Sequence, residues 1–336
     1  MNEVDLDKLH TNQKLLVQEL EKRGIKVWIL DQKFELLEAQ YKDHHEFILD
    51  RFGVKTPHTL TLISRDKYVA KHLLKRNGLS VPEGKLFDKE QIKAALEYGS
   101  ELGWPVVAKP NWGSHGDNVF MDLNSEFELK KAIDLLLGAN PKMPFFVERQ
   151  FIGKEHRIFI TQNGEYAVVH RDPAHVIGDG LKTLKELSEL ETERRMNPRS
   201  TVLSPLILDE VVFEHLRKQK LELDFIPKKG EKIYLRLTSN VAKGATCEEV
   251  TEKVHPSLIE IAKRALKVFE GLPYAGIDIL TKDETQEQTQ ESYNILEINP
   301  NPGFTLHMKP GKGESRNVAA FVADLIFPET KTNGEG

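Results

Sequence analysis

Two carboxylates and an amide in one short stretch of the chain have the types and spacing of a metal site. Asp278 lies in the apolar run GIDIL, and Glu297 and Asn299 lie in the run YNILEIN, with a polar, acidic connection between them. Both runs have the composition of strands, so the stretch 276–303 predicts a hairpin. Alternate residues of a strand share a face, so Glu297 and Asn299 point the same way, and Asp278 can join them across the hairpin. Three oxygen ligands of this kind suit Mg²⁺, which also binds the phosphates of substrates.

The same alternation occurs in an ordinary antiparallel hairpin with one polar face, so a purely structural role stays open. In either case Leu296 and Ile298 are expected to face the core, because they alternate with the polar pair. The segment after Asn299 favours the functional interpretation, since PNPG at 300–303 is a rigid turn whose backbone can lie close to a ligand.

A lysine followed by a glycine-containing loop is the second feature with chemical meaning. Lys109 ends the strand-like run WPVVAKP, and the loop NWGSHGDNV follows it directly. Glycines let backbone N–H groups approach phosphate oxygens, and a lysine beside them supplies a positive charge. The lysine precedes the glycines, unlike the order of the strand–GxxxxGK[ST]–helix phosphate loop, so the loop alone is a weak indication of nucleotide binding.

A scaffold of helices and strands must position these residues, and the hydrophobic periodicity predicts one. The segment from Ser64 to Gly78 is expected to be one helix with Ser64 as its N-cap. Helices are expected over residues 9–23, 64–78, 91–102, 125–137, 183–192, 209–219, 256–271 and 316–325. Besides the hairpin, strands are expected over residues 25–31, 104–110, 145–152, 155–160, 166–169 and 232–237.

Length and composition indicate a globular protein of two or three compact units. The chain has 336 residues and a net charge of −5, which implies no general attraction to nucleic acid or acidic lipid. No apolar run approaches the roughly 20 residues of a membrane span, and the acidic N-terminus lacks the apolar core of a signal peptide. The single cysteine, Cys247, cannot form an internal disulfide, and together these features predict a cytoplasmic location.

Taken in order, the segments resemble the ATP-grasp superfamily of carboxylate–amine ligases. The resemblance covers roughly residues 61–328 and is particularly to the ATP-grasp region of cyanophycin synthetase and to the glutathione-forming region of bifunctional glutathione synthetases. The segments that carry it are SRDKYVAKHLL, VVAKPNWGSHGDNV, VERQFIGKEHRIF, IYLRLTSNVAKGAT, ILEINPNPGF and, most specifically, RDPAHVIGDG.

The resemblance implies an α+β fold of the ATP-grasp type with a short α/β N-terminal segment. The expected units are an N-terminal segment at 1–62, an ATP-grasp domain at 63–328 and a tail at 329–336. Within the domain, a lid subdomain is expected at about 80–150 and a C-terminal catalytic subdomain at about 151–328.

The resemblance also implies a role for each matching position. Expected around ATP are Lys67 with its neighbour Lys71 and Lys109 at the phosphates, Gly113, Ser114, His115 and Gly116 in a flexible loop over them, Glu148, Arg149, Gln150 and Phe151 in the adenine hinge, and Glu155 at the ribose. Expected at the reacting groups are Asp278, Glu297 and Asn299 with Mg²⁺, Arg236 near the γ-phosphate, and Arg171, Asn240 and the backbones of Gly244 and Gly303 at the acyl phosphate or acceptor. A hairpin salt bridge for Arg171 and a solvated position for Glu148 are the structural alternatives.

The implied activity is ATP-dependent formation of an amide bond between a carboxylate and an amine, through an acyl phosphate and with release of ADP and phosphate. Two Mg²⁺ ions are expected, with Mn²⁺ able to substitute. The substrates are expected to be amino acids, other small molecules or short peptides, with no nucleic-acid or membrane partner, and a homodimer is left open. Full cyanophycin and bifunctional glutathione synthetases carry further regions, so the resemblance does not name the two substrates. The alternatives are a regulatory protein that binds nucleotide without turnover and a kinase.

Overall fold

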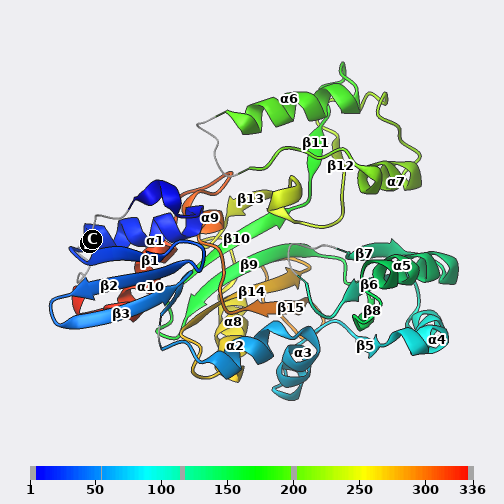
Figure 1. Cartoon of the computed structure of the whole chain (residues 1–336). Coiled ribbons are helices and arrows are strands. Elements are labelled where there is room, and N and C mark those ends of the chain that lie inside the picture. Colours follow the sequence, from blue (N-terminus) through cyan, green and yellow to red (C-terminus); the bar gives the residue numbers. More distant parts are fainter. Residues whose placement is uncertain (1–4, 54, 114–117, 198–202, 332–336) are drawn as a thin grey trace.

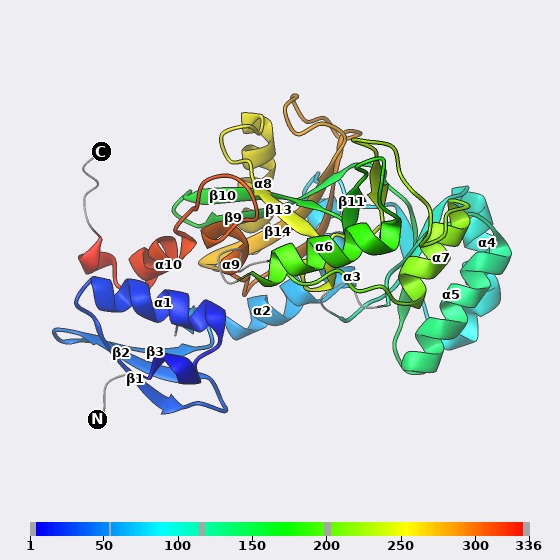
Figure 2. The same ribbon diagram turned by 90° about the horizontal axis from the view of Figure 1, so that it is seen from above.

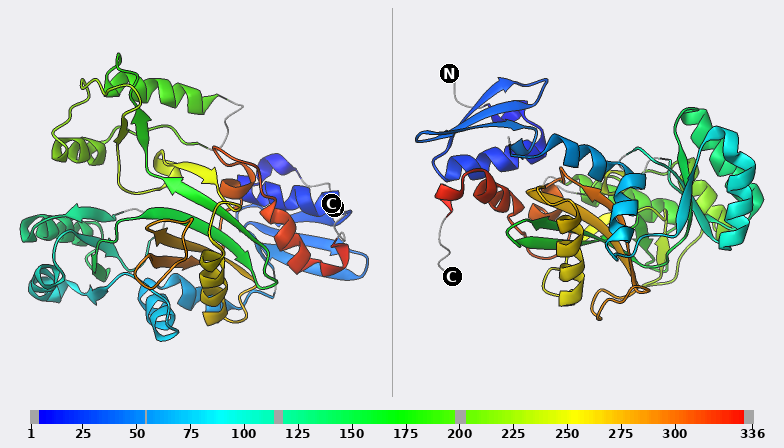
Figure 3. Two further views of the ribbon diagram at one scale, coloured as in Figure 1. Left: turned by 180° about the vertical axis from the view of Figure 1, so that it is seen from behind. Right: turned by 90° about the horizontal axis from the view of Figure 1, so that it is seen from below.

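The computed structural model describes residues 5–53, 55–113, 118–197 and 203–331. These residues form an N-terminal unit, a central sheet, a unit within residues 84–149 that we call the lid after the predicted lid subdomain, and a smaller unit around β11 (His175–Ile177) and β12 (Lys232–Tyr234) (Figure 1). The N-terminal unit and the lid lie at opposite ends of the molecule (Figure 3). In the part of the chain that the structure describes, we find no helix long and apolar enough to cross a membrane.

The N-terminal unit is a helix packed on a small antiparallel sheet. Its elements are α1 (Thr11–Lys22), β1 (Lys26–Asp31), β2 (Leu36–Tyr41), β3 (His44–Leu49) and β4 (Phe52–Gly53), and the strands pair in chain order. The segment combines a helix with strands, as predicted. Its sheet is antiparallel because only Lys42 and Asp43 connect β2 to β3, and a two-residue turn cannot carry the crossover that parallel strands require.

The central sheet carries the predicted hairpin. Its strands are β13 (Thr246–Glu249), β10 (Tyr166–Asp172), β9 (Lys154–Thr161), β14 (Tyr274–Thr281) and β15 (Tyr293–Asn299), paired in that order. One face, including Ile158 and Ile277, packs on α3 (Lys67–Arg76) and α8 (Pro256–Val268). The other face, including Phe159 and Tyr274, shares a core with α1 and α10 (Val318–Ile326) (Figure 2).

The lid and the β11–β12 unit are smaller layers with cores of their own. In the lid, β5 (Gly84–Phe87), β8 (Phe145–Arg149), β6 (Val106–Pro110) and β7 (Phe120–Leu123) form a sheet covered by α4 (Ile92–Leu102) and α5 (Glu126–Ala139). In the other unit, β11 (His175–Ile177) and β12 (Lys232–Tyr234) pack with α6 (Leu184–Met196) and α7 (Glu210–Lys218). The strand expected over 232–237 therefore ends earlier, before Arg236.

The helix predicted over 64–78 is two helices instead of one. The first, α2, spans His58–Arg65, and α3 begins at Lys67. Between them Asp66 has an extended backbone, with φ −75° and ψ 111°, and its side chain accepts a hydrogen bond from the Val69 N–H. The N-cap is therefore Asp66 rather than Ser64, which is buried in the last turn of α2 and donates to the Thr61 carbonyl.

Candidate active site

The β14–β15 hairpin brings the three predicted metal ligands together. Asp278 lies opposite Glu297, and Asn299 lies opposite Gly276 in the antiparallel ladder. The register shifts directly after Asp278, so Ile279 pairs with Ile295 and Leu296 is the extra residue of a bulge.

The bulge corrects one expectation about the core. Leu296 is only partly buried, whereas Ile295 and Ile298 are fully buried in the core beside α8. The simple alternation fails because an extra residue in one strand reverses the faces on either side of it. Glu297 and Asn299 still share the polar face with Asp278, so the predicted site survives the irregularity.

Two arginines hold the Asp278 carboxylate in the buried interior. The Nη2 atom of Arg157 lies 2.8 Å from Asp278 Oδ2, and Arg171 Nη2 lies 2.9 Å from the same oxygen. Burial favours the protonated form of Asp278, but the charges of Arg157 and Arg171 outweigh it and hold the pKa well below its usual range. Arg171 also pairs with Glu155, the residue opposite it in the β9–β10 hairpin, so it makes the hairpin salt bridge that was its structural alternative and in addition reaches the predicted metal site.

The pKa of Glu297 is shifted in the opposite direction from that of Asp278. Burial and the adjacent negative charge of Asp278 raise the pKa of Glu297, and Lys67 and Arg157 oppose that rise, each with a nitrogen 3.8 Å from a Glu297 oxygen. Two carboxylates that repel one another in a buried place are stabilised by a divalent cation. Together with the amide oxygen of Asn299, this donor set fits Mg²⁺, which prefers oxygen ligands.

Three lysines lie on the side of the site where phosphates are expected. Lys67 Nζ donates to the Gly113 carbonyl at 2.9 Å, which ties α3 to the first glycine of the glycine loop. Lys109 Nζ lies 2.8 Å from Glu148 Oε2, and Lys71 contacts the other oxygen of the same carboxylate. Lys71 and Lys109 are buried and Lys67 is part-buried. Burial lowers the pKa of both Lys67 and Lys71, although neighbouring carboxylates oppose the shift.

The side chains of three of the four predicted adenine-hinge residues, Glu148, Arg149 and Gln150, contact other residues of the protein. Glu148 points its carboxylate at the lysines, so it is buried rather than solvated. Arg149 pairs with Glu83 on the surface at 3.1 Å, and the Gln150 side chain accepts a hydrogen bond from the Asp122 N–H at 2.6 Å. Phe151 is partly buried.

Glu155 links three segments of the chain. Its carboxylate accepts hydrogen bonds from Arg171 and from the Ser239 hydroxyl. Through Arg171 it is one step from Asp278, so the predicted ribose carboxylate and the predicted metal site belong to one network of charges. Ser239 begins the small-residue loop of which Asn240 is the second residue.

The remaining predicted residues lie in two loops and beyond β12. Arg236 is buried, and its Nη2 lies 2.7 Å from Asp209 Oδ2 and 3.1 Å from the Ile207 carbonyl oxygen. In the described part of the chain it forms no ion pair with Asp278 or Glu297.

Asn240 accepts a hydrogen bond from the Ala242 N–H at 2.9 Å. Gly244 has φ 94°, and a Cβ there would lie 2.9 Å from Leu206, which requires glycine. Gly303 lies against the Asn12 side chain. Ser114, His115 and Gly116 lie outside the described residues.

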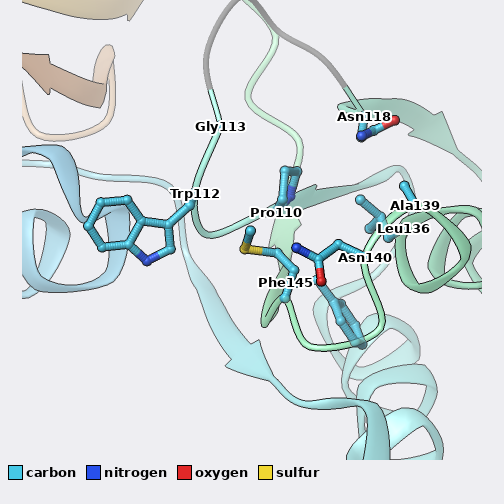
Figure 4. Close-up of a pocket in the computed structure, with 9 residues that line it drawn as sticks. Pro110, Trp112, Gly113, Asn118, Leu136, Ala139, Asn140 and Phe145 are labelled. Atoms are coloured by element: carbon cyan, nitrogen blue, oxygen red, sulfur yellow. The ribbon is translucent and has the colours of Figure 1, made fainter.

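A cavity of about 240 Å³ opens in the lid beside the glycine loop (Figure 4). Its lining comes from the segment after β6, the end of α5 and the start of β8, and comprises Pro110, Trp112, Gly113, Asn118, Leu136, Ala139, Asn140, Met143 and Phe145. Of the residues predicted to bind nucleotide, its lining contains only Gly113. The cavity is therefore beside the lysine cluster rather than part of it.

The chain is similar to known proteins over nearly its whole length. A cyanophycin synthetase of Geminocystis herdmanii is 34% identical over 335 residues, which are 97% of this chain and 38% of that protein. The glutathione biosynthesis bifunctional protein GshAB of Clostridium perfringens is 29% identical over 332 residues, 97% of this chain and 42% of that protein. The crystal structure of a bifunctional glutathione synthetase from Pasteurella multocida has a TM-score of 0.69 and 26% identity, covering 96% of this chain and 45% of that one.

The chain has the ATP-grasp fold. Its homology to cyanophycin synthetase and GshAB confirms the predicted resemblance. No family model matches the chain. The chain spans about two fifths of the length of the curated relatives that it matches.

Several residues of this candidate site were not predicted. Arg157, which contacts both carboxylates of the predicted metal site, is two residues after Glu155 in β9, so strand alternation alone could have placed it on the same face. Asp66 and Asn111 join the start of α3 to the segment after Lys109, with Asn111 Nδ2 3.2 Å from Asp66 Oδ2. No local signal links them, because they are 45 residues apart in the chain.

Proposed function

We propose that the chain is an ATP- and Mg²⁺-dependent ligase that joins the carboxylate of an amino acid or short peptide to an amine. The observation that carries the proposal is the juxtaposition of the buried Asp278 and the part-exposed Glu297, with Lys67 between Glu297 and the glycine loop. Phosphoryl transfer needs positioned cations and no nucleophilic side chain, which matches a site built from lysines, arginines and carboxylates.

In the proposed reaction the substrate carboxylate attacks the γ-phosphorus of ATP, the bond from that phosphorus to the β–γ bridging oxygen breaks, and ADP leaves. The amine then attacks the carbonyl carbon of the acyl phosphate, phosphate leaves, and the nitrogen loses a proton. When bound, Mg²⁺ supplies positive charge to the phosphate oxygens. Two ions are proposed, held by Asp278, Glu297 and Asn299, and Mn²⁺ is proposed to substitute.

The chain's own residues are proposed to orient and neutralise the reacting groups. Lys67 and Lys109 neutralise phosphate oxygens, and the loop from Gly113 covers them. Arg171, the Asn240 loop and the Gly303 backbone hold the acyl phosphate or the acceptor. Arg236 reaches the γ-phosphate on this proposal by leaving its pair with Asp209, whose carboxylate is part-exposed and can be solvated. The cytoplasmic location, a homodimer and the lack of nucleic-acid or membrane partners stay predictions from composition.

The test is to supply ATP, Mg²⁺ and amino acids or dipeptides in pairs, and to measure ADP, phosphate and the mass of any new amide. We expect ADP and phosphate in equal amounts with the amide, and only when a carboxylate and an amine are both present. The matched control is Glu297→Gln, which keeps the shape and removes one charge, and should lower turnover by roughly 10²-fold or more.

Each other outcome contradicts a stated part of the proposal or favours one of the alternative functions. AMP and pyrophosphate would contradict the acyl-phosphate route. ADP release with no need for an amine would indicate a kinase. Nucleotide binding without turnover on any pair would support the regulatory alternative, and a fully active Glu297→Gln variant would overturn the metal assignment.

A further inference from the structure

The turn after β15 sets the direction of a predicted metal ligand. The Asn301 N–H donates to Asn299 Oδ1 at 3.0 Å. This hydrogen bond fixes which end of the Asn299 amide is oxygen and leaves the second lone pair of that oxygen for a cation. The orientation of Asn299 therefore depends on the backbone position of Asn301, in the segment 300–305 that we call the ligand turn.

Residues of the N-terminal unit hold the ligand turn from its outer side. Arg51 Nη2 donates to the Asn301 carbonyl at 3.1 Å, and the Asn301 side chain donates to the Asp50 carboxylate. At the other end of the turn, Asn12 Oδ1 accepts from the N–H groups of Phe304 at 2.7 Å and Thr305 at 3.1 Å. These contacts join parts of the chain that are 250 to 293 residues apart.

The holding residues are themselves fixed. His10 Nε2 lies 2.8 Å from Asp50 Oδ1, and Arg51 Nη1 lies 2.6 Å from the same oxygen. The Tyr274 hydroxyl donates to the Arg51 carbonyl at 2.6 Å, which ties the group to β14, the strand of Asp278. His10, Glu35 and Asp50 place three ligand atoms within 4.8 Å, but the charge of Arg51 already neutralises Asp50, so this group serves as an anchor rather than a second metal site.

We infer that the N-terminal unit is a working part of the active site, in which Asn12, Asp50 and Arg51 are positioning residues for the ligand turn and, through Asn301, for Asn299. The inference rests on the proposed function, because it takes Asn299 as a metal ligand. Groups that orient a ligand from behind set metal affinity without touching the metal. Loosening the ligand turn therefore weakens the binding of the cation more than it weakens the binding of the nucleotide.

A purely structural role for these contacts makes a different prediction. If they only attach the N-terminal unit to the rest of the chain, then breaking another contact that attaches this unit should weaken Mn²⁺ binding by the same amount. Arg23 provides the matched control, since its Nη1 lies 2.5 Å from Asp324 Oδ1 and its Nη2 donates to the Ala320 carbonyl at 3.1 Å. These contacts attach α1 to α10 and do not involve the ligand turn.

The test measures Mn²⁺ binding by electron paramagnetic resonance in the presence of ADP, which requires no turnover. Asn12→Ala removes the acceptor for the two N–H groups, and we expect Mn²⁺ to bind about 10- to 100-fold more weakly. Asn12→Asp keeps an acceptor and should restore binding to near the wild-type level. Arg51→Lys keeps the charge beside Asp50, loses the reach to Asn301, and should act in the same direction as Asn12→Ala if the latter does not fold.

Two controls separate metal binding from nucleotide binding and from general attachment of the N-terminal unit. Binding of ADP without metal should change little in Asn12→Ala, and Arg23→Gln should leave Mn²⁺ binding near wild type. An Asn12→Ala or Arg51→Lys protein that binds Mn²⁺ as the wild type does would overturn the inference, and so would an equal loss in Arg23→Gln. A wild type that binds Mn²⁺ with ADP but forms no amide would contradict the proposed function and leave the inference standing, whereas a wild type that binds no Mn²⁺ would overturn both.

Discussion

At the scale of single residues, Glu148 is the group on which the phosphate side of the site depends. Its two oxygens contact Lys71 and Lys109, and all three side chains are at most 10% exposed. Burial favours the protonated form of Glu148, but the two lysine charges outweigh it and lower the pKa of the carboxyl. A carboxylate between two buried ammonium groups keeps both lysines in place, and on the proposed function phosphate oxygens would compete with it for them.

Glu148→Gln tests this arrangement. The substitution leaves two buried ammonium groups without a full counter-charge, so we expect the free energy of unfolding to fall by about 3 kcal/mol or more. The control is Glu83→Gln, which removes an exposed partner of Arg149 and should change stability by no more than about 0.5 kcal/mol. Chemical denaturation of both variants at neutral pH measures the difference. Equal, small losses would show that the lysines do not depend on Glu148.

What the sequence can predict at this scale is local. The spacing of Glu297 and Asn299 is enough to place them on one face, because strand alternation involves neighbours only. The partner of Asp278 is Arg157, 121 residues away, and the pairing of β9 with β14 that joins them depends on the whole sheet. The bulge at Leu296 could not be predicted from the sequence for the same reason, because it appears only in the pairing of β15 with β14.

At the scale of elements, the start of α3 positions two of the lysines. Asp66 caps the helix, so Lys67 becomes its first residue, and Lys71, four residues on, lies on the same side. Asn111 strengthens the cap, because its Oδ1 accepts from the Tyr68 N–H at 3.1 Å and its Nδ2 donates to Asp66. The prediction of one helix from Ser64 missed this, since serine and aspartate are equally good N-caps and only the extended backbone of Asp66 decides between them.

Asp66→Ala, compared with a cap removed elsewhere, distinguishes the effect of the α3 N-cap on stability from its effect on ATP binding. Losing an N-cap side chain costs about 1 kcal/mol of stability, and Ser125→Ala, which removes the cap of α5 in the lid, should cost a similar amount. Only Asp66→Ala should also weaken ATP binding several-fold, because it frees Lys67 and Asn111 together. Thermal unfolding and a nucleotide-binding titration of both variants decide the matter. Unchanged ATP affinity in Asp66→Ala would mean that α3 positions its lysines without this cap.

At the scale of the whole molecule, the N-terminal unit and the end of the chain share one core with the central sheet. Leu16 and Ile48 pack in the same cluster as Phe159, Phe304 and Phe327. The division predicted at residue 62 stays a prediction about folding units, and this packing argues that both sides of it fold together. Such long-range packing could not be predicted from the sequence, because each amphipathic segment shows that it has an apolar face and not which partner covers that face.

A histidine also joins the N-terminal sheet to the last described turn of the chain. His44, at the start of β3, places Nδ1 2.7 Å from Glu329 Oε1 and Nε2 3.1 Å from Glu46 Oε1, and its ring lies 4.7 Å from that of Phe327. A histidine donates from both nitrogens only when it is protonated. The hydrogen bond to Glu329 is the main cause that raises the pKa of His44, and burial opposes it in part.

This contact gives a prediction with a definite sign. Because the folded pKa of His44 lies above the unfolded value of about 6.5, the stabilisation is fully present below that pH and is lost as the pH rises through the folded pKa. The difference in unfolding free energy between the wild type and His44→Gln should therefore be largest near pH 6, on the order of 1 kcal/mol or less for a part-exposed pair, and should shrink towards pH 9. The control is His45→Gln, which replaces an exposed neighbour in the same strand and should change the free energy of unfolding little. A difference that grows with pH would show that neutral His44, and not the charged pair, joins Glu329 in the last described turn to the N-terminal sheet.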